Sequence, residues 1–578
     1  MRNLTQPGLG KFKSDKTPEP KVSSNHIDRT HFFLGLIVMG NLLYTLVKFP
    51  NYIFSGAMWA EMGVNFFPIS RASDVRTVFF SPDAGYIPFG LRLISWIFKL
   101  LGVSTSTIPY VYSVSAILGA SLLVGFFCLK RFRILIPSDS VRFLVALLVI
   151  ITADFETRTY INFSYFAVFF VFINVAIMYK KQFSTHVFVL FPILVFTKPV
   201  LLAILPILLF SFFSSNRTKL QKMIFFSILV ATVIQVLTII SSNSDGVFRQ
   251  EEKTSLLQLI KNLFTYFFAT FAIPLNQFFP TSVTTKVLLG LAFFSIIMCV
   301  ALIVRNQLSV LAYFGLTTLF FITAVNTFAV SAHFNSSYSL LSGMPLFRYI
   351  VPVIDIGIIL LACTVINFFL IVNYFFTKSE MRIFWNRIAN ATLSVGLIYS
   401  VFFASSYINQ PVSPALFNSQ WVRMSTVIDS GDPVCVPIDP AGWTYGRGCR
   451  LLNSDFNWTG FGGYNESIVV RVNELFTLDI PKNTDWIGLQ GLGLLVKPRT
   501  NENLRLFATL KIELKTKEIV QVETFQNANA NGFLLFFHLP EAVLFEDVST
   551  ISLEASSDLF VGIQSPLKPD PATLWYGN

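Results

Sequence analysis

Three acidic residues follow the first long apolar stretch of the chain: Glu61, Asp74 and Asp83. Glu61 stands between Trp59 and Gly63, a few residues beyond the end of that stretch. A carboxylate at a membrane surface can act as a general base, because it can take the proton from an attacking hydroxyl group. One such base is sufficient for an inverting transfer when the donor already carries a phosphate leaving group. The alternative is that these acids are ordinary solvated side chains.

A lysine interrupts another apolar stretch, residues 184–213, within the sequence Thr197-Lys198-Pro199. An ionisable residue at this depth is costly and is therefore a functional candidate. Its expected partner is a phosphate group, toward which a lysine acts as a point charge. The alternative is a lysine at a helix end whose ammonium group reaches out to water.

Arg348 and Tyr349 come directly before a late apolar stretch. Arg348 would lie at the outer membrane boundary, where a guanidinium group can bind two phosphate oxygens at once. Tyr349 could instead belong to the belt of aromatic residues at the membrane interface, which is the commoner role for tyrosine there.

A short polar turn between the third and fourth apolar stretches contains Asp154, Glu156 and Arg158, and Asn162 lies just beyond it. We expect these polar groups to face the same cavity as Glu61. They could contact an acceptor or hold a metal ion, and a solvated turn is an equal alternative. No motif calls for a cofactor: a divalent metal is possible but not indicated. The chain also lacks a Gly-rich phosphate loop and a DxD motif at a cytoplasmic edge, which argues against a soluble nucleotide donor.

The elements that must position these residues are long apolar helices. Hydrophobic residues make up 53% of the chain and charged residues 13%, against about 25% charged residues in soluble domains. Runs of roughly 20 apolar residues are long enough to cross a bilayer, and such continuous runs indicate helices. The sequence predicts about eleven spans: 32–50, 107–129, 142–155, 161–179, two short spans within 184–213, 221–241, 285–304, 308–330, 350–376 and 389–407.

Two helices outside the spans are also predicted. Residues 86–102 have the character of an interfacial amphipathic helix, and residues 254–271 that of a surface helix. The first of these belongs to a long segment, residues 51–106, which also contains Glu61; we call it the first loop.

The net charge of +11 is concentrated in short segments between alternate spans, as the positive-inside rule expects. The chain is therefore not predicted to bind nucleic acid. Residues 1–30 are predicted to be a disordered cytoplasmic tail, and residues 31–407 the membrane domain. With the basic clusters inside, the first loop and residues 408–578 fall on the external side.

Residues 408–578 change character and contain short alternating runs that read as β-strands, for example 506–514 and 532–539. The fold expected is thus a polytopic α-helical membrane protein with a C-terminal, mainly β, periplasmic domain. Cys435 and Cys449 both lie in this part of the chain. If it is external, the two could form a disulfide bond.

The order of these features resembles the C-type glycosyltransferase superfamily (GT-C), whose members are polytopic enzymes that use polyprenyl-phosphate sugars. The segment Trp59-Ala60-Glu61-Met62-Gly63, followed by Gly85-Tyr86 and Arg92-Leu93, is similar to a bacterial membrane group. That group often reads Trp-x-Glu-Asp-Gly, then Pro-Tyr-Ala-Gly-Tyr, then an Arg-Leu helix. Serotype-converting O-antigen glucosyltransferases share its general plan. The resemblance covers about residues 30–400 and not the tail.

The resemblance implies an inverting glycosyltransferase of the bacterial inner membrane. The enzyme would move a sugar from an undecaprenyl-phosphate donor to a cell-envelope glycan, such as the O-antigen of lipopolysaccharide, on the periplasmic face. Its partners would be the lipid-linked sugar, the glycan acceptor and the bilayer.

The resemblance, together with the residue types and positions described above, suggests roles for individual residues. Glu61 would be the base. Met62 stands where the group often has Asp, and Asp83 stands where it often has Tyr, so Asp83 could supply the second carboxylate. Cationic and aromatic side chains would hold the donor phosphate, and the remaining polar residues would line the cavity or contact the acceptor. The phosphate-binding residues would be Lys198, Arg348, Tyr349 and Arg92, and the cavity residues Asp74, Asp154, Glu156, Arg158 and Asn162.

Other functions remain open. A transporter or flippase of lipid-linked saccharides would have inverted repeats or polar residues at mid-membrane depth. A polysaccharide polymerase or ligase would rely on external Arg and His residues, and an assembly protein would bind through its tail.

Overall fold

A computed structural model describes most of the chain. The segment 1–28, the predicted span 389–407 and the residues Arg348, Tyr349 and Cys449 lie outside the described residues. The described residues are 29–83, 85–179, 185–214, 217–241, 255–271, 282–329, 350–375, 420–431, 434–439, 443–446, 450–452, 463–481, 488–500, 504–528, 530, 532–565 and 568–577.

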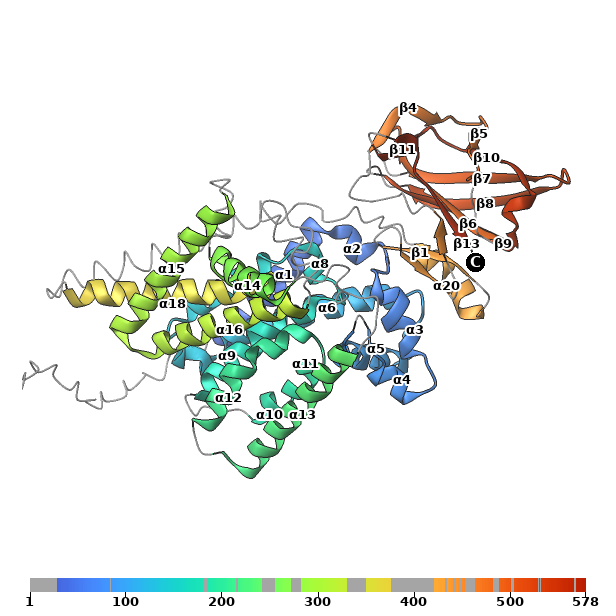
Figure 1. The fold of residues 1–578 in the computed structure, drawn as a ribbon. Helices are drawn as coiled ribbons and strands as arrows, with labels where there is room; N and C mark the ends of the chain where they lie inside the picture. Colours follow the sequence, from blue (N-terminus) through green and yellow to red (C-terminus); the bar gives the residue numbers. More distant parts are fainter. Residues whose placement is uncertain are drawn as a thin grey trace, which may run out of the picture.

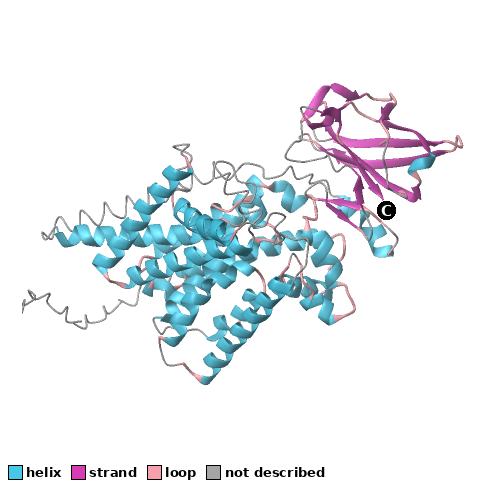
Figure 2. Cartoon of the chain, viewed as in Figure 1, coloured by secondary structure: helices cyan, strands magenta, loops and turns pink. Residues whose placement is uncertain are grey.

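The first part of the chain is a helical bundle, and the last part consists mainly of strands (Figures 1 and 2). Among the described residues, six helices are long and apolar enough to cross a membrane, and two apolar helical segments are shorter. The six are Thr30–Lys48, Ile108–Cys128, Lys219–Ser241, Val283–Val304, Gln307–Phe328 and Val351–Val372, and the shorter two are Phe163–Tyr179 and Pro199–Phe213.

A polytopic helical membrane protein is therefore supported, but the predicted count of about eleven spans is not confirmed. Helix α7, Asp139–Ile151, has only 13 residues where the sequence predicted a span over 142–155. The stretch 184–213 is broken at Lys198, as predicted, because the backbone there is extended and Pro199 starts a separate 3-10 turn.

The remaining helices connect and cover these spans. In chain order the helices are α1 Thr30–Lys48, α2 Pro50–Phe54, α3 Phe67–Ser70, α4 Val75–Phe80, α5 Phe89–Leu100, α6 Ile108–Gly125, α7 Asp139–Ile151, α8 Phe155–Arg158, α9 Ala167–Tyr179, α10 Thr185–Phe188, α11 Phe191–Val195, α12 Leu205–Phe213, α13 Lys219–Ser241, α14 Leu256–Thr270, α15 Val283–Val304, α16 Gln307–Ala329, α18 Val351–Phe375 and α20 Gln420–Ser430.

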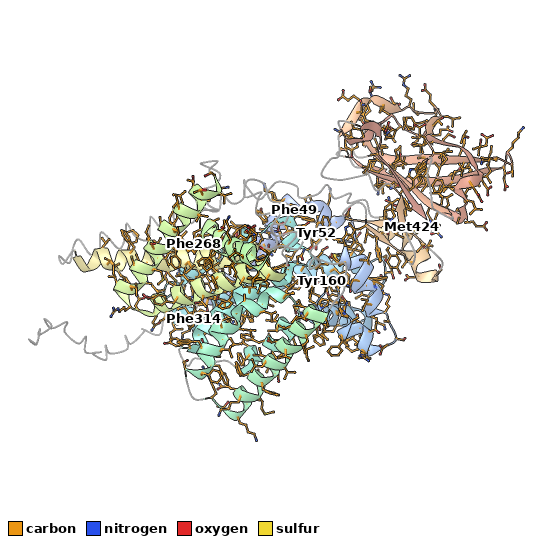
Figure 3. The ribbon with its side chains drawn as sticks, in the orientation of Figure 1. Phe49, Tyr52, Tyr160, Phe268, Phe314 and Met424 are labelled. Atoms are coloured by element: carbon orange, nitrogen blue, oxygen red, sulfur yellow. The ribbon has the colours of Figure 1, made fainter. Side chains whose placement is uncertain are left out.

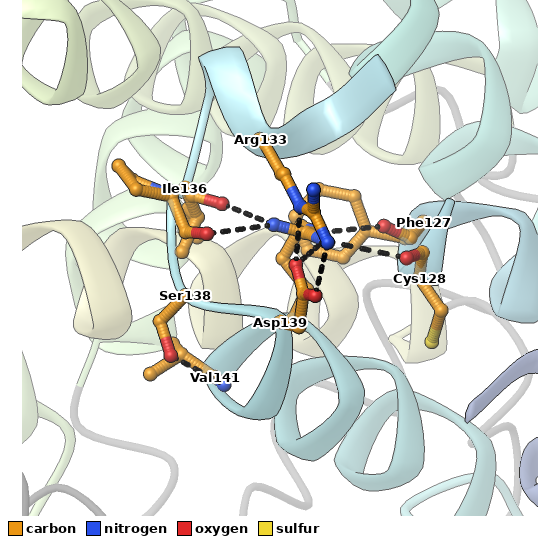
Figure 4. A network of polar contacts seen from close by, with 9 residues as sticks. Phe127, Cys128, Arg133, Ile136, Ser138, Asp139 and Val141 are labelled. Carbon is orange, nitrogen blue, oxygen red and sulfur yellow. Dashed lines mark hydrogen bonds and ion pairs between the residues drawn. The ribbon is translucent and has the colours of Figure 1, made fainter. Parts of the chain in front are cut away.

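A network of polar contacts fixes the start of α7 (Figure 4). The guanidinium group of Arg142 is fully buried and donates to the carbonyl oxygens of Ile136, at 2.6 Å, and Phe127, at 3.2 Å. It also pairs with Asp139, whose other carboxylate oxygen lies 2.6 Å from the Arg133 guanidinium. The bonds satisfy a cation that would be costly to bury alone, so the connection between α6 and α7 is held in one conformation.

The tail forms two antiparallel sheets and a separate hairpin of β1 and β2. The smaller sheet has the order β5-β10-β7-β8, and the larger has the order β12-β11-β6-β13-β3, with β4 paired to β11 and β9 paired to β6. The strands are β1 Val436–Ile438, β2 Trp443–Tyr445, β3 Arg450–Leu452, β4 Tyr464–Val470, β5 Phe476–Leu478, β6 Leu489–Pro498, β7 Leu504–Leu514, β8 Ile519–Ala528, β9 Phe533–Val543, β10 Val548–Ala555, β11 Leu559–Ser565, β12 Lys568–Pro571 and β13 Thr573–Gly577.

The two sheets enclose one apolar core, so the predicted mainly β tail is a β-sandwich. Its core contains Leu510 and Ile551 from the smaller sheet and Leu494 and Phe537 from the larger one. Alternation decides which residues enter this core: every second residue of β8 is buried, from Val522 onward.

Helix α20 and strand β1 pack with the helical bundle. Trp421, Met424 and Ile438 belong to the same apolar core as the bundle residues Tyr160 and Phe314. Figure 3 shows Met424 on the side of the bundle that faces the sandwich. The segment from α20 to β2 therefore joins the two parts of the molecule.

Candidate functional site

Glu61 lies where the first loop turns sharply. Ala60 has a positive φ of 43°, which is rare for a residue with a side chain. Glu61 then caps a π-helical turn, Met62–Phe66, a conformation that is often found at functional sites. The ring of Trp59 packs edge-on against Phe155, with centroids 4.7 Å apart. One carboxylate oxygen of Glu61 is buried and has no hydrogen-bond partner among the described residues.

Asp83 lies within electrostatic reach of Glu61. Its backbone exchanges two hydrogen bonds with Tyr86, at 2.8 and 3.0 Å, which close a tight turn. Burial raises the pKa of the Asp83 carboxyl, and the negative charge of Glu61 raises it further. The cations Arg92 and Lys198, together with a hydrogen bond from Asn65, act in the opposite direction. The sequence predicted two carboxylates here, and the structure brings them together.

Arg92 stabilises the Asp83 turn through hydrogen bonds. Its side chain is fully buried on α5, and it donates to Asn65 Oδ1 at 3.0 Å and to Ser81 Oγ at 2.9 Å. Burial lowers its pKa to about 10, while the charge of Asp83 acts to raise it. The guanidinium group therefore stays charged at neutral pH, and its two terminal nitrogens are engaged by the loop itself. Phosphate binding by Arg92 stays a prediction.

Lys198 reaches the same region from the break before Pro199. Its Nζ donates to the Tyr86 hydroxyl at 2.9 Å and to Asn162 Oδ1 at 3.4 Å. The rings of Tyr86 and Tyr165 lie 5.3 and 5.1 Å from it, within the range of cation–π attraction. Only 6% of the residue is exposed, so water screens this charge poorly.

Helix α13 holds the segment that follows Tyr86. The buried amide of Gln235 accepts from the Ile87 N–H at 3.1 Å and donates to the Ile87 carbonyl at 3.4 Å. Gln235 and Asn65 were not predicted to contribute to the site, and Tyr86 was singled out only as part of the resembled motif. A polar amide inside the apolar run 221–241 was the available signal for Gln235.

The predicted polar turn lies beside the loop of Glu61, through the contact of Phe155 with Trp59. Asp154 is buried and accepts from the Thr157 N–H at 3.0 Å, as the cap of α8. Arg158 is buried and donates to the Ala153 carbonyl at 3.2 Å and to a side chain of α1. These contacts organise the turn. Glu156 is half-buried, and a role for it in acceptor contact stays a prediction.

Asp74 lies apart from these groups. It is exposed and caps α4, where it accepts from the N–H groups of Arg76, at 3.1 Å, and Thr77, at 3.0 Å. A further hydrogen bond, from the Thr77 hydroxyl, is the largest cause of a lowered pKa of its carboxyl. This is the bonding expected of an N-cap.

Of the four remaining predicted residues, only Cys435 lies in the described part of the chain. Cys435 is disulfide-bonded, whereas Cys128, Cys299 and Cys363 are free. Its pairing with Cys449, and the phosphate roles of Arg348 and Tyr349, fall on residues outside the described part of the chain and stay predictions. Within the described part, no group of three or more His, Cys, Asp or Glu side chains could hold a metal ion.

No protein-family model matches the chain, and no curated protein matches it. A solved structure that it resembles is the arabinosyltransferase EmbB from Mycobacterium smegmatis, with 11% sequence identity and a TM-score of 0.28. The alignment covers 96% of this chain and 66% of that chain. A likeness at so low a TM-score carries no argument, and the function is inferred from the site.

Proposed function

We propose that the chain is a membrane-bound inverting glycosyltransferase of C type. It would transfer a sugar from a polyprenyl-phosphate donor, such as undecaprenyl phosphate, to a hydroxyl group of a cell-envelope glycan on the periplasmic face of the bacterial inner membrane. The observation that carries the proposal is the convergence of Glu61 and Asp83 with the cation Lys198, at the junction of the first loop and the helical bundle.

Each group has one task. Glu61 takes the proton of the acceptor hydroxyl, and the oxygen forms a bond to the anomeric carbon of the sugar. The bond between that carbon and the phosphate oxygen breaks, and polyprenyl phosphate leaves with the electron pair. Lys198 stabilises the negative charge that grows on the leaving phosphate. Asp83, whose pKa is raised, supplies the second carboxylate of the pair.

The remaining polar residues maintain this geometry. Arg92 braces the Asp83 turn through Ser81 and Asn65. Gln235 ties the following residue to α13. Positioning of this kind contributes to the rate because a reacting group must be held within a narrow range of geometry.

The test compares three matched acid-to-amide variants of the purified protein with a polyprenyl-phosphate sugar and a glycan acceptor. Glu61→Gln should lower turnover by roughly 10²- to 10⁴-fold and leave donor binding nearly unchanged. Asp83→Asn should also lower it. Asp74→Asn is the control from the same loop, because asparagine is an equally good helix cap, and it should retain turnover.

Each result has a clear meaning. Loss of turnover in Asp83→Asn but not in Glu61→Gln would show that the wrong carboxylate was chosen as the base. Full turnover in both variants would refute the enzymatic function.

A second candidate function has one observation in its favour. Asp355 on α18 is fully buried, and neither of its carboxylate oxygens has a hydrogen-bond partner among the described residues. Acids inside membrane helices are common in transport pathways, so a transporter or flippase of lipid-linked saccharides would use Asp355. Under that function, Asp355→Asn would abolish translocation in proteoliposomes while Glu61→Gln would not.

A further inference from the structure

We infer that the C-terminal end of strand β1 positions Glu61, with Ile438 and Asp439 as the positioning residues. The inference rests on the proposed function for its catalytic meaning. It assigns to the tail a role in the active site, although the tail begins more than 300 residues after Glu61 in the sequence.

Asp439 pairs with the backbone on the N-terminal side of Glu61. It forms a parallel β-bridge with Trp59: the Asp439 N–H donates to the Met58 carbonyl at 2.8 Å, and the Ala60 N–H donates to the Asp439 carbonyl. Two hydrogen bonds therefore fix the peptides directly before Glu61. Asp439 is itself buried.

The bridge explains how Ala60 keeps a positive φ of 43°. A left-handed conformation is unfavourable for a residue with a Cβ atom, and it persists only where the surrounding structure holds it. Here it turns the chain so that Glu61 begins the π-helical turn Met62–Phe66.

Ile438 packs on the C-terminal side of Glu61. A Cβ atom added to Gly63 would lie 2.8 Å from Ile438 Cδ1 and 3.5 Å from Ile438 Cγ2. The first distance is too short for two carbon atoms, and the second is an ordinary contact. A side chain at position 63 would therefore force the turn and the end of the Ile438 side chain to move apart. This gives a physical reason for the glycine of the Trp-x-Glu-x-Gly segment.

A second contact holds the end of the same turn. The indole of Trp421, on α20, packs edge-on against Phe67, with centroids 4.8 Å apart, and against Tyr445 of β2 at 5.0 Å. Its Nε1–H donates to the Thr105 carbonyl at 2.8 Å. The residues on both sides of Glu61 are therefore held by one continuous segment, α20 to β2.

The decisive experiment uses two substitutions that compensate only if Ile438 touches Gly63. Gly63→Ala should lower kcat about tenfold, with the KM for the donor within about twofold, because the turn must move a few tenths of an ångström away from Ile438. Ile438→Val removes Cδ1 and leaves the nearest Ile438 atom at 3.5 Å. The double variant Gly63→Ala/Ile438→Val should therefore recover kcat to within about threefold of the wild type.

The control is Ile551→Val, which removes the same methyl group from an equally buried isoleucine in the sandwich core. It should not rescue Gly63→Ala. Hydrogen exchange of the Ala60 and Asp439 amides gives a readout that does not depend on turnover: exchange should speed up in Gly63→Ala and slow again in the double variant.

Different outcomes would overturn the proposed function and the positioning role of the hairpin. If Glu61→Gln has no effect on turnover, the proposed function fails. If Glu61→Gln impairs turnover but Ile438→Val rescues neither kcat nor amide protection, or if Ile551→Val rescues them as well, the positioning role of the hairpin is overturned.

Discussion

Replacement of Lys198 by methionine removes one charge from the site and keeps the length of the side chain. The ammonium group is held between the hydroxyl of Tyr86 and the amide oxygen of Asn162, with the ring of Tyr165 beside it. Methionine can occupy the same space, so we expect the fold to persist. The rate of transfer from the phosphate-linked donor should fall.

The size of the expected loss of activity follows from the burial of Lys198. Only 6% of Lys198 is exposed, so the charge acts through the protein and not through bulk water. Two opposite unit charges about 4 Å apart attract by about 4 kcal/mol at an effective dielectric constant of about 20. Part of this attraction already exists in the ground state, and only the part that grows in the transition state changes kcat. A loss of roughly 10²-fold in kcat is therefore expected, with about 10³-fold as the upper limit.

The assay is steady-state transfer from a polyprenyl-phosphate sugar in nanodiscs, with kcat and KM for the donor measured separately. Lys286→Met is the matched control, because Lys286 is equally buried, at 6% exposure, on a different helix, α15. It should retain wild-type kinetics. Lys198→Arg should recover little activity, because the larger planar group does not fit between the two tyrosine rings.

Wild-type kinetics in Lys198→Met would refute the phosphate role and leave Lys198 as a structural cation. Equal losses in Lys198→Met and Lys286→Met would show that any buried lysine of the bundle is needed for folding, which would also contradict the argument.

Three further predictions concern the protonation, pairing and placement of the chain. Asn65 donates a hydrogen bond that lowers the pKa of Asp83; Asn65→Ala should raise that pKa, so that turnover is lost at a higher pH as the solution is acidified, and an unchanged acid limb of the pH–rate profile would contradict the coupling. Cys435 and Cys449 should be resistant to alkylation until the protein is reduced, and two freely alkylated thiols in the native protein would exclude the pair. Reporters fused after residue 25 and at the C-terminus should lie on opposite sides of the membrane, because the basic clusters alternate; the same side for both would overturn the placement of the site.

The long apolar runs were sufficient to predict helices that match α6, α13, α15, α16 and α18 within a few residues. A membrane helix needs about 20 apolar residues, and that requirement is visible in the sequence alone. Alternation was similarly sufficient for β7, which was predicted over residues 506–514, since one face of that strand is apolar. It could not mark β6, which is buried along nearly its whole length. The break at Lys198 followed from Pro199, which cannot continue a helix hydrogen-bond ladder.

Periodicity could not identify which residues meet across the bundle. The amphipathic pattern over 86–102 predicted an interfacial helix, and α5 does form at Phe89–Leu100. Its charged residue Arg92 is buried, however, because the Asp83 turn and Asn65 supply polar partners on the inner side. Those partners come from another part of the first loop, and no property of the helix itself reveals them.

The candidate site was likewise predictable from the sequence in part, and its other part was decided by the tertiary structure. Glu61, Asp83 and Lys198 were recognisable from the sequence, because each is an ionisable residue beside or within an apolar run, where a charge is costly and needs a reason. Their partners were decided by tertiary structure alone. Tyr86 meets a lysine 112 residues away, and Ile87 meets a glutamine 148 residues away. The bridge from Asp439 to the backbone beside Glu61 is formed by main-chain groups, which every residue carries and which therefore leave no mark in the sequence.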